Sequence, residues 1–129
     1  GRGIIITGNE AWKNYTVSAD IAVQRLNTGG LAVRVQGLNR YYGLVINSSN
    51  KLQLIKVVNE VKVLKEMDFN LEYFKNYKLS LKIKDNALSA YLENKLVLEY
   101  EDKNNLLDSG AMGLIVEDGT LVTDEIVVG

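Results

Sequence analysis

Alternation of apolar and polar residues with a period of two is the feature that most constrains this chain. In the clearest segment, residues 77–84, tyrosine, leucine and isoleucine alternate with lysine and serine. Successive side chains of a β-strand point to opposite faces, so a segment of this kind predicts a strand with one buried face and one face in water.

The same pattern recurs along the whole chain. The segments are residues 4–7, 15–23, 31–36, 41–48, 52–58, 61–65, 77–84, 87–93, 96–100, 111–117 and 121–128. Turn-forming residues connect them at 28–30, 37–39, 48–50, 85–86, 93–94 and 118–119, which favours hairpins between antiparallel neighbours. The alternation lapses at residues 68–76 and 102–109, where we expect a helical or irregular stretch.

About ten short strands joined by hairpins predict an all-β protein, a two-sheet antiparallel β-sandwich of the jelly-roll type. A closed barrel is the alternative, but the lysine- and serine-lined outer faces favour two sheets packed over one apolar layer. The core that this fold predicts consists of Val17, Ile21, Val33, Leu44 or Val45, Leu79, Leu81, Leu92, Leu114 and Ile126.

Composition narrows the class of protein. The chain has 129 residues, 47% hydrophobic and 24% charged, as in a single folded domain. Its 15 basic and 16 acidic side chains nearly cancel, so we expect no nucleic-acid partner. No apolar run approaches the roughly 20 residues that cross a membrane, so we expect no membrane partner.

Because the chain opens at Gly1 almost directly into a predicted strand, we expect residues 1–129 to be one domain excised from a longer multidomain protein.

The chain contains neither cysteine nor histidine. Thiol nucleophiles, disulfides, zinc-thiolate sites and histidine-dependent catalysis are therefore excluded. Carboxylate chemistry and oxygen-ligated calcium stay open.

Several short motifs occur in a familiar order. Trp12 precedes YTVSADI at residues 15–21, and the series continues with GLAVRVQ at 30–36, YYGLVI at 41–46, LQLIK at 52–56, YKL at 77–79, AYL at 90–92, SGAMGL at 109–114 and TDEIVV at 123–128. This outline resembles the concanavalin A-like, laminin-G-like jelly-roll modules appended to glycoside hydrolases. The resemblance implies a non-catalytic carbohydrate-binding module for an oligosaccharide or polysaccharide, with a catalytic domain in the same parent chain and a secreted or cell-surface location. Asn76, directly before Tyr77, departs from the pattern, which often has tryptophan there.

The leading candidate for the binding site is a patch of arginine and tyrosine on a sheet face. Arg34 lies between Val33 and Val35 in a predicted strand, so we expect its guanidinium on the opposite face from both, where it suits vicinal sugar hydroxyls. The alternative is an ion pair with Asp20 or Glu117.

Further candidates come from the neighbouring strands. Tyr41 and Tyr42 point to opposite faces, so only one of them joins Arg34, where an aromatic ring stacks on a sugar. The side-chain amides of Gln36 and Asn47 are expected hydrogen-bonding groups, and an outward Tyr91 is a further candidate. Trp12, Phe69, Tyr73 and Phe74 are expected to have structural roles.

Calcium is the cofactor that the resemblance implies, as a structural ion. We expect its ligands to be scattered carboxylates of the first and last strands, chiefly Asp20 and Asp124. Glycoside hydrolysis needs two carboxyls flanking one bond, and Asp124 and Glu125 point to opposite faces of one strand. A binding module is therefore the leading hypothesis, with a protein-interaction or adhesion module and a jelly-roll hydrolase as alternatives.

Overall fold

A computed structural model describes residues 2–23, 29–47, 49–70, 72, 75–117 and 121–129. They form eleven strands, and none of these described residues is helical. Accordingly, no helix here has the length and apolar character needed to span a membrane. The strands are β1 (Arg2–Thr7), β2 (Tyr15–Val23), β3 (Gly29–Gly37), β4 (Arg40–Asn47), β5 (Lys51–Val58), β6 (Glu60–Asp68), β7 (Asn76–Lys84), β8 (Ala87–Leu92), β9 (Lys95–Glu101), β10 (Ala111–Glu117) and β11 (Leu121–Val128).

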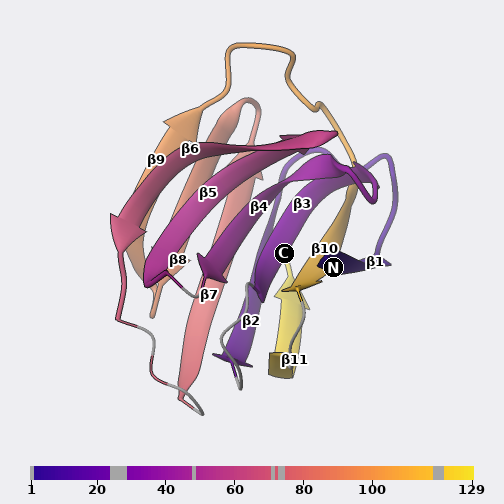
Figure 1. Cartoon of the computed structure of the whole chain (residues 1–129). Helices are drawn as coiled ribbons and strands as arrows, with labels where there is room; N and C mark the ends of the chain where they lie inside the picture. The colour runs from indigo at the N-terminus through magenta and orange to yellow at the C-terminus, as the bar shows by residue number, and fades with distance from the viewer. Residues whose placement is uncertain (1, 24–28, 48, 71, 73–74, 118–120) are drawn as a thin grey trace.

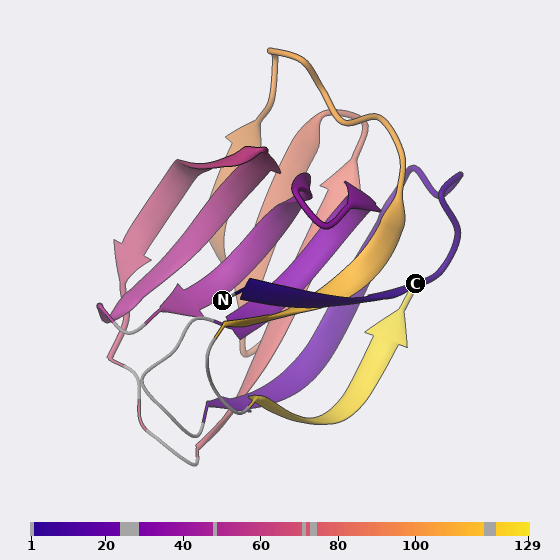
Figure 2. The same cartoon turned by 45° about the vertical axis from the view of Figure 1, so that its right-hand side comes forward.

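The strands form two antiparallel sheets that lie face to face (Figure 1). The six-stranded sheet has the order β1-β10-β3-β4-β5-β6, and the five-stranded sheet has the order β11-β2-β7-β8-β9. The predicted two-sheet sandwich is therefore confirmed. Residues 102–110 leave β9 and cross one end of the sandwich to β10 in the other sheet (Figures 1 and 2).

The main core lies between the sheets, as the alternation predicts. Apolar side chains from the inner faces of both sheets are almost completely buried there. Leu92 is partly buried against the core, whereas the side chain of Ile126 lies outside the described residues. The predicted members found in this core are Val17, Ile21, Val33, Leu44, Leu79, Leu81 and Leu114.

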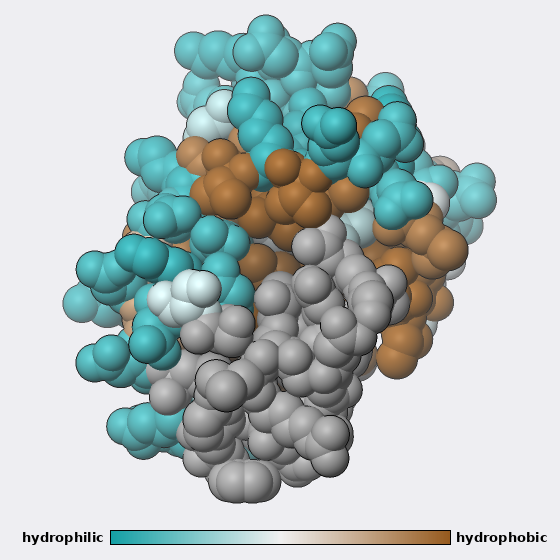
Figure 3. Space-filling model, in the orientation of Figure 1, coloured by the Kyte–Doolittle hydropathy of each residue, from teal (hydrophilic) through white to brown (hydrophobic). Residues whose placement is uncertain are grey.

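A second apolar cluster lies on the outer face of the six-stranded sheet, and its members are at most 2% exposed. Figure 3 shows that hydrophobic residues are also exposed at the surface on the side of the molecule seen in Figure 1. Gly43 of β4 makes the second cluster possible, because a Cβ there would lie 2.9 Å from the Ile115 side chain and 3.1 Å from that of Ile55. These two isoleucines therefore close over β4. The cluster consists of Ala32, Val35, Tyr41, Val45, Ile55, Val57 and Ile115.

Two local expectations need correction. Gly29 and Gly30 lie inside β3 and not in a hairpin loop. A Cβ on Gly30 would be 1.9 Å from the Leu44 carbonyl oxygen, so glycine is there for the close approach of β4. The stretch at 68–76 is also shorter than expected, because β6 continues to Asp68. Where described, this stretch and residues 102–109 are irregular and not helical.

The aromatic side chains predicted to have structural roles pack against the main core where the structure describes them. Trp12 packs against the main core with its ring edge-on to Tyr15, the centroids 5.4 Å apart. Phe69 packs in the same manner on Tyr77 at 4.9 Å. Tyr73 and Phe74 lie outside the described residues.

Candidate functional site

A β-bulge in β3 sets the position of Arg34. The register of β3 shifts between Val33 and Gly37 against β4, and it also shifts against β10. Arg34 itself has φ +50°, in the left-handed region that few non-glycine residues adopt. Because a bulge re-aims side chains, Val33 enters the main core, Val35 enters the outer cluster, and Arg34 points to the end of the sandwich. The expectation that both valines share one face is wrong for this reason.

The Arg34 side chain is only 2% exposed, and oxygen atoms surround it. Its Nε donates to the Lys13 carbonyl at 2.9 Å, Nη1 to the Leu107 carbonyl at 2.8 Å, and Nη2 to Asn14 Oδ1 at 3.3 Å. A guanidinium has five N–H groups, so one on each terminal nitrogen keeps no acceptor in the described part of the chain. Burial lowers the pKa of Arg34, and nearby hydroxyl and carboxyl groups act in the opposite direction.

The ion pair of Arg34 with Asp20 is wrong. Asp20 lies on β2 in the other sheet, opposite Lys78. The other suggested partner, Glu117, has its side chain outside the described residues. Arg34 instead binds backbone carbonyls and an amide, and so it holds together segments that lie far apart in the sequence.

Tyr15 fixes the backbone of the bulge. Its hydroxyl accepts from the Arg34 backbone N–H at 2.6 Å and lies 2.8 Å from the Gly110 carbonyl, to which it donates. Burial raises the pKa of Tyr15 to about 12, so the hydroxyl is neutral at physiological pH. Gly110 has φ +153°, and a Cβ there would come within 2.3 Å of the Arg34 carbonyl carbon. Glycine therefore allows the start of β10 to press against the bulge.

The Arg34 guanidinium lies at the floor of a hollow of about 330 Å³, which we call the Arg34 hollow. Four segments surround it: the loop before β2, the bulge, the β7–β8 turn and residues 102–110. The turn is held in place because the Asp85 backbone N–H donates to Asn14 Oδ1 at 2.8 Å. The lining combines cations, carboxylates and amides with the aliphatic side chain of Leu106, and it consists of Lys13, Asn14, Arg34, Asp85, Asn86, Leu106 and Asp108.

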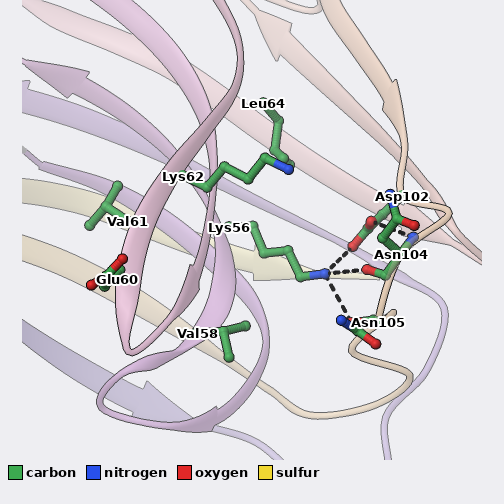
Figure 4. Close-up of a pocket in the computed structure, with 9 residues that line it drawn as sticks. All are labelled: Lys56, Val58, Glu60, Val61, Lys62, Leu64, Asp102, Asn104 and Asn105. Atoms are coloured by element: carbon green, nitrogen blue, oxygen red, sulfur yellow. Dashed lines mark hydrogen bonds and ion pairs between the residues drawn. The ribbon is translucent and has the colours of Figure 1, made fainter.

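A buried network holds the 102–110 loop against the six-stranded sheet. Lys56 Nζ donates to Asp102 Oδ2 at 2.6 Å and to the carbonyls of Asn104 and Asn105 at 2.7 and 2.9 Å (Figure 4). The Tyr42 hydroxyl donates to the same Asp102 oxygen at 2.5 Å. Burial acts to raise the pKa of Asp102, but hydrogen bonds from Lys56 and Tyr42 outweigh it and hold that pKa below its usual value.

The sequence contained a signal for this network. In β5, Leu52 and Leu54 point into the main core, and Lys56 follows in the same inward row. A lysine in an inward row needs a buried partner, because an unpaired buried charge is costly. The partner, Asp102, lies in the irregular stretch that follows β9. No alternation of apolar and polar residues surrounds it, so the sequence did not identify it as the partner of Lys56.

A second hollow of about 490 Å³ lies beside this network, between β6 and the 102–110 loop (Figure 4). We call it the β6 hollow. Its lining mixes aliphatic and polar side chains from Lys56, Val58, Glu60, Val61, Lys62, Leu64, Asp102, Asn104 and Asn105.

The other predicted site residues lie in several places. Gln36 is near the Arg34 hollow, where its amide donates to the Ser109 carbonyl at 2.9 Å. Tyr41 and Tyr42 point to opposite faces, as predicted, and both are buried. The remaining two candidates, Asn47 and Tyr91, do not lie at the end of the sandwich that holds the Arg34 hollow.

Asn47 and Tyr91 are the candidates that lie elsewhere. Asn47 ends β4 at the opposite end of the sandwich, where its Oδ1 accepts from the backbone N–H groups of Ser49 and Lys51. Tyr91 is on β8 in the five-stranded sheet, half-buried and opposite Ser80.

The described carboxylates do not support the predicted calcium ion. Asp20 faces Lys78, and no group of three or more acidic side chains that could hold a metal occurs within the described part of the chain. The side chain of Asp124 lies outside that part.

Residues 2–114 match the family described as "Galactocerebrosidase, C-terminal lectin domain". The chain belongs to this lectin-domain family. The resemblance to a carbohydrate-binding jelly roll appended to a glycoside hydrolase is thereby confirmed. A comparison with curated protein sequences finds no match.

Solved structures show the same fold as this lectin domain. The carbohydrate binding module CBM66 from Bacillus subtilis is 21% identical, with a TM-score of 0.90 over 99% of this chain and 81% of its own. Chicken galectin 2 is 11% identical, with a TM-score of 0.74 and full coverage of both chains. Congerin II, in a structure liganded with lactose and MES, is 12% identical, with a TM-score of 0.71 and full coverage of both chains.

Proposed function

We propose that this domain is a non-catalytic carbohydrate-binding module that binds a glycan in the Arg34 hollow. The observation that carries the proposal is the guanidinium of Arg34, which lines a hollow together with carboxylate and amide side chains and keeps two N–H groups free of described acceptors. The family and the lactose ligand of congerin II support a glycan as the ligand class.

The lining suits the hydroxyl groups of a sugar. A hydroxyl can accept from Arg34 while it donates to the carboxylates of Asp85 or Asp108, and charge-assisted hydrogen bonds of this kind are stronger than neutral ones. A volume of about 330 Å³ is near the lower limit for small-molecule sites. The hollow therefore fits one sugar residue, such as a chain end.

The hollow is preorganised. Arg34 is fixed by three hydrogen bonds, and Asn14 holds both the guanidinium and the Asp85 backbone. A strained backbone such as that of Arg34 occurs most often at functional sites. Because these groups are already ordered, binding costs little conformational entropy.

The two tyrosines support the site indirectly in this proposal. The Tyr41 ring is fully buried in the outer cluster, so it offers no exposed surface for a sugar. The Tyr42 hydroxyl accepts from the Leu107 backbone N–H at 3.1 Å, which makes Tyr42 a positioning residue for the loop. The family also supports a glycoside hydrolase as the parent chain, with catalysis in another domain.

The proposal predicts that Asp108→Ala weakens glycan binding. Wild type and variant are compared on a printed glycan array, and every retained glycan is then titrated by calorimetry. Loss of a charge-assisted hydrogen bond lowers affinity by about tenfold or more. The matched control, Glu99→Ala, removes another exposed carboxylate on β9 and leaves affinity unchanged.

Two results would contradict the proposal. One is an array on which wild type retains no glycan. The other is equal affinity of wild type and Asp108→Ala for every retained glycan.

A further inference from the structure

We propose that the β6 hollow binds a second sugar residue, so that the domain recognises an oligosaccharide and not only a chain end. This inference rests on the proposed function, because the second residue belongs to the same glycan. Its evidence is the lining of the β6 hollow and the loop that this hollow shares with the Arg34 hollow.

The two hollows lie on either side of one loop. Asn104 and Asn105 line the β6 hollow, while Leu106 and Asp108 line the Arg34 hollow. The two sets of residues meet after Asn105, whose backbone has φ +50°. One glycan crossing this loop therefore meets both hollows.

The loop is rigid where it separates the hollows. Lys56 binds the carbonyls of Asn104 and Asn105 from below, and Arg34 binds the carbonyl of Leu107 from the other side. The Leu107 side chain is completely buried. Because the loop is fixed, the distance and orientation between the two hollows stay constant. Two linked sugar residues can then bind both hollows at a low cost in conformational entropy.

The aliphatic side of the β6 hollow fits the C–H face of a sugar ring. Val58 is 36% exposed and Leu64 is half-buried, and both line the hollow. Figure 4 shows Leu64 and Lys62 on the side of β6 that faces Asn104 and Asn105, whereas Val61 and Glu60 lie on the opposite side of the strand. The hollow therefore combines aliphatic and amide side chains, as a sugar ring combines apolar C–H groups with a polar rim of hydroxyls.

The charges of the hollow favour a neutral ligand. Lys56 has three N–H groups and three oxygen acceptors, one of which is the Asp102 carboxylate, so this pair is neutral and saturated. The other two charged side chains of the lining, Glu60 and Lys62, are opposite in sign. An anion or a strongly charged peptide therefore gains no net attraction, whereas a neutral glycan finds the donors and acceptors that its hydroxyls need.

The test compares glycan length with a substitution in the β6 hollow. Val58→Glu places a charged side chain in the hollow, and Val63→Glu makes the same change on the neighbouring strand β6. Val63 is 43% exposed and is not part of the lining, so the second variant controls for charge and for strand stability. Wild type and both variants, each verified as folded by thermal melting, are titrated with mono-, di-, tri- and tetrasaccharides of each sugar that wild type retains on the array.

We expect Val58→Glu to weaken binding of chains of two or more residues by about tenfold and to leave monosaccharide affinity unchanged. Val63→Glu should match wild type at every length. Equal affinity of Val58→Glu and wild type for all lengths, or equal losses in the two variants, overturns the second subsite alone. An array without any retained glycan overturns this inference together with the proposed function.

Discussion

The buried Lys56–Asp102 pair predicts a large loss of stability when one partner is removed. In Lys56→Met, Asp102 loses its ammonium partner and keeps only the Tyr42 hydroxyl and the Asn104 backbone N–H. The carbonyls of Asn104 and Asn105 also lose their donor. The side chains of Lys56 and Asp102 are only 10% and 5% exposed, so water replaces the lost contacts poorly.

The expected size follows from this burial. Removing one partner of a buried pair costs about 3–5 kcal/mol, whereas an exposed pair contributes about 0–1 kcal/mol. Because Asp102 keeps two donors, we expect Lys56→Met to lower the free energy of unfolding by about 3 kcal/mol. In urea this lowers the midpoint by about 1–3 M, since the slope for a small domain is about 1–3 kcal/mol per M.

The assay is equilibrium urea unfolding of four proteins: wild type, Lys56→Met, Asp102→Leu and the double variant. The double variant should lose clearly less stability than the sum of the single losses, because it leaves no unpaired charge. Lys51→Met, which breaks the exposed pair with Asp68, is the control and should shift the midpoint little. A midpoint of Lys56→Met equal to that of wild type, or strictly additive losses, would refute this reasoning.

Two further predictions concern stability. The pKa of Asp102 is lower in the folded than in the unfolded protein, so its contribution is present above pH of about 4 and is lost as the pH falls through the lower folded value. Between pH 7 and pH 3, wild type should therefore lose stability more steeply than Asp102→Asn, and parallel curves in urea unfolding would contradict this. Arg34→Ala leaves the buried carbonyl of Leu107 and the partly buried carbonyl of Lys13 without their donor and should lower the free energy of unfolding by about 2 kcal/mol. An unchanged melting curve for Arg34→Ala would show that these bonds are not structural.

The strands could be predicted because alternation reports local geometry directly. In β7, Leu79 and Leu81 fill the core, while Lys82 and Lys84 are exposed, as the pattern of that segment indicates. Which strands become neighbours in one sheet is not encoded in any single segment. For this reason Tyr91, although correctly placed away from the core-facing side of its strand, lies on a different sheet from Arg34.

The bulge at Arg34 could not be predicted. Val33, Arg34 and Val35 continue the period of two without interruption. The bulge is hidden in this pattern because both faces of β3 are apolar, so that Val33 enters the main core and Val35 enters the outer cluster. Its causes are distant in sequence: the Tyr15 hydroxyl binds the Arg34 backbone, and Gly110 leaves room for it. The sequence therefore identified Arg34 as a candidate site residue. It did not predict the direction of the Arg34 side chain or the residues that surround it.

Glycan binding at the Arg34 hollow is the central claim, and a nitrogen-15 NMR titration tests it most directly. The labelled domain is titrated with the glycan that wild type retains most strongly on the array, and backbone amide shifts are mapped on the fold. The account predicts that the largest shifts belong to Asn14, Asp85, Asn86 and Asp108, which surround the hollow. Shifts confined to the outer face of the six-stranded sheet, or no shift at saturating glycan, would contradict it.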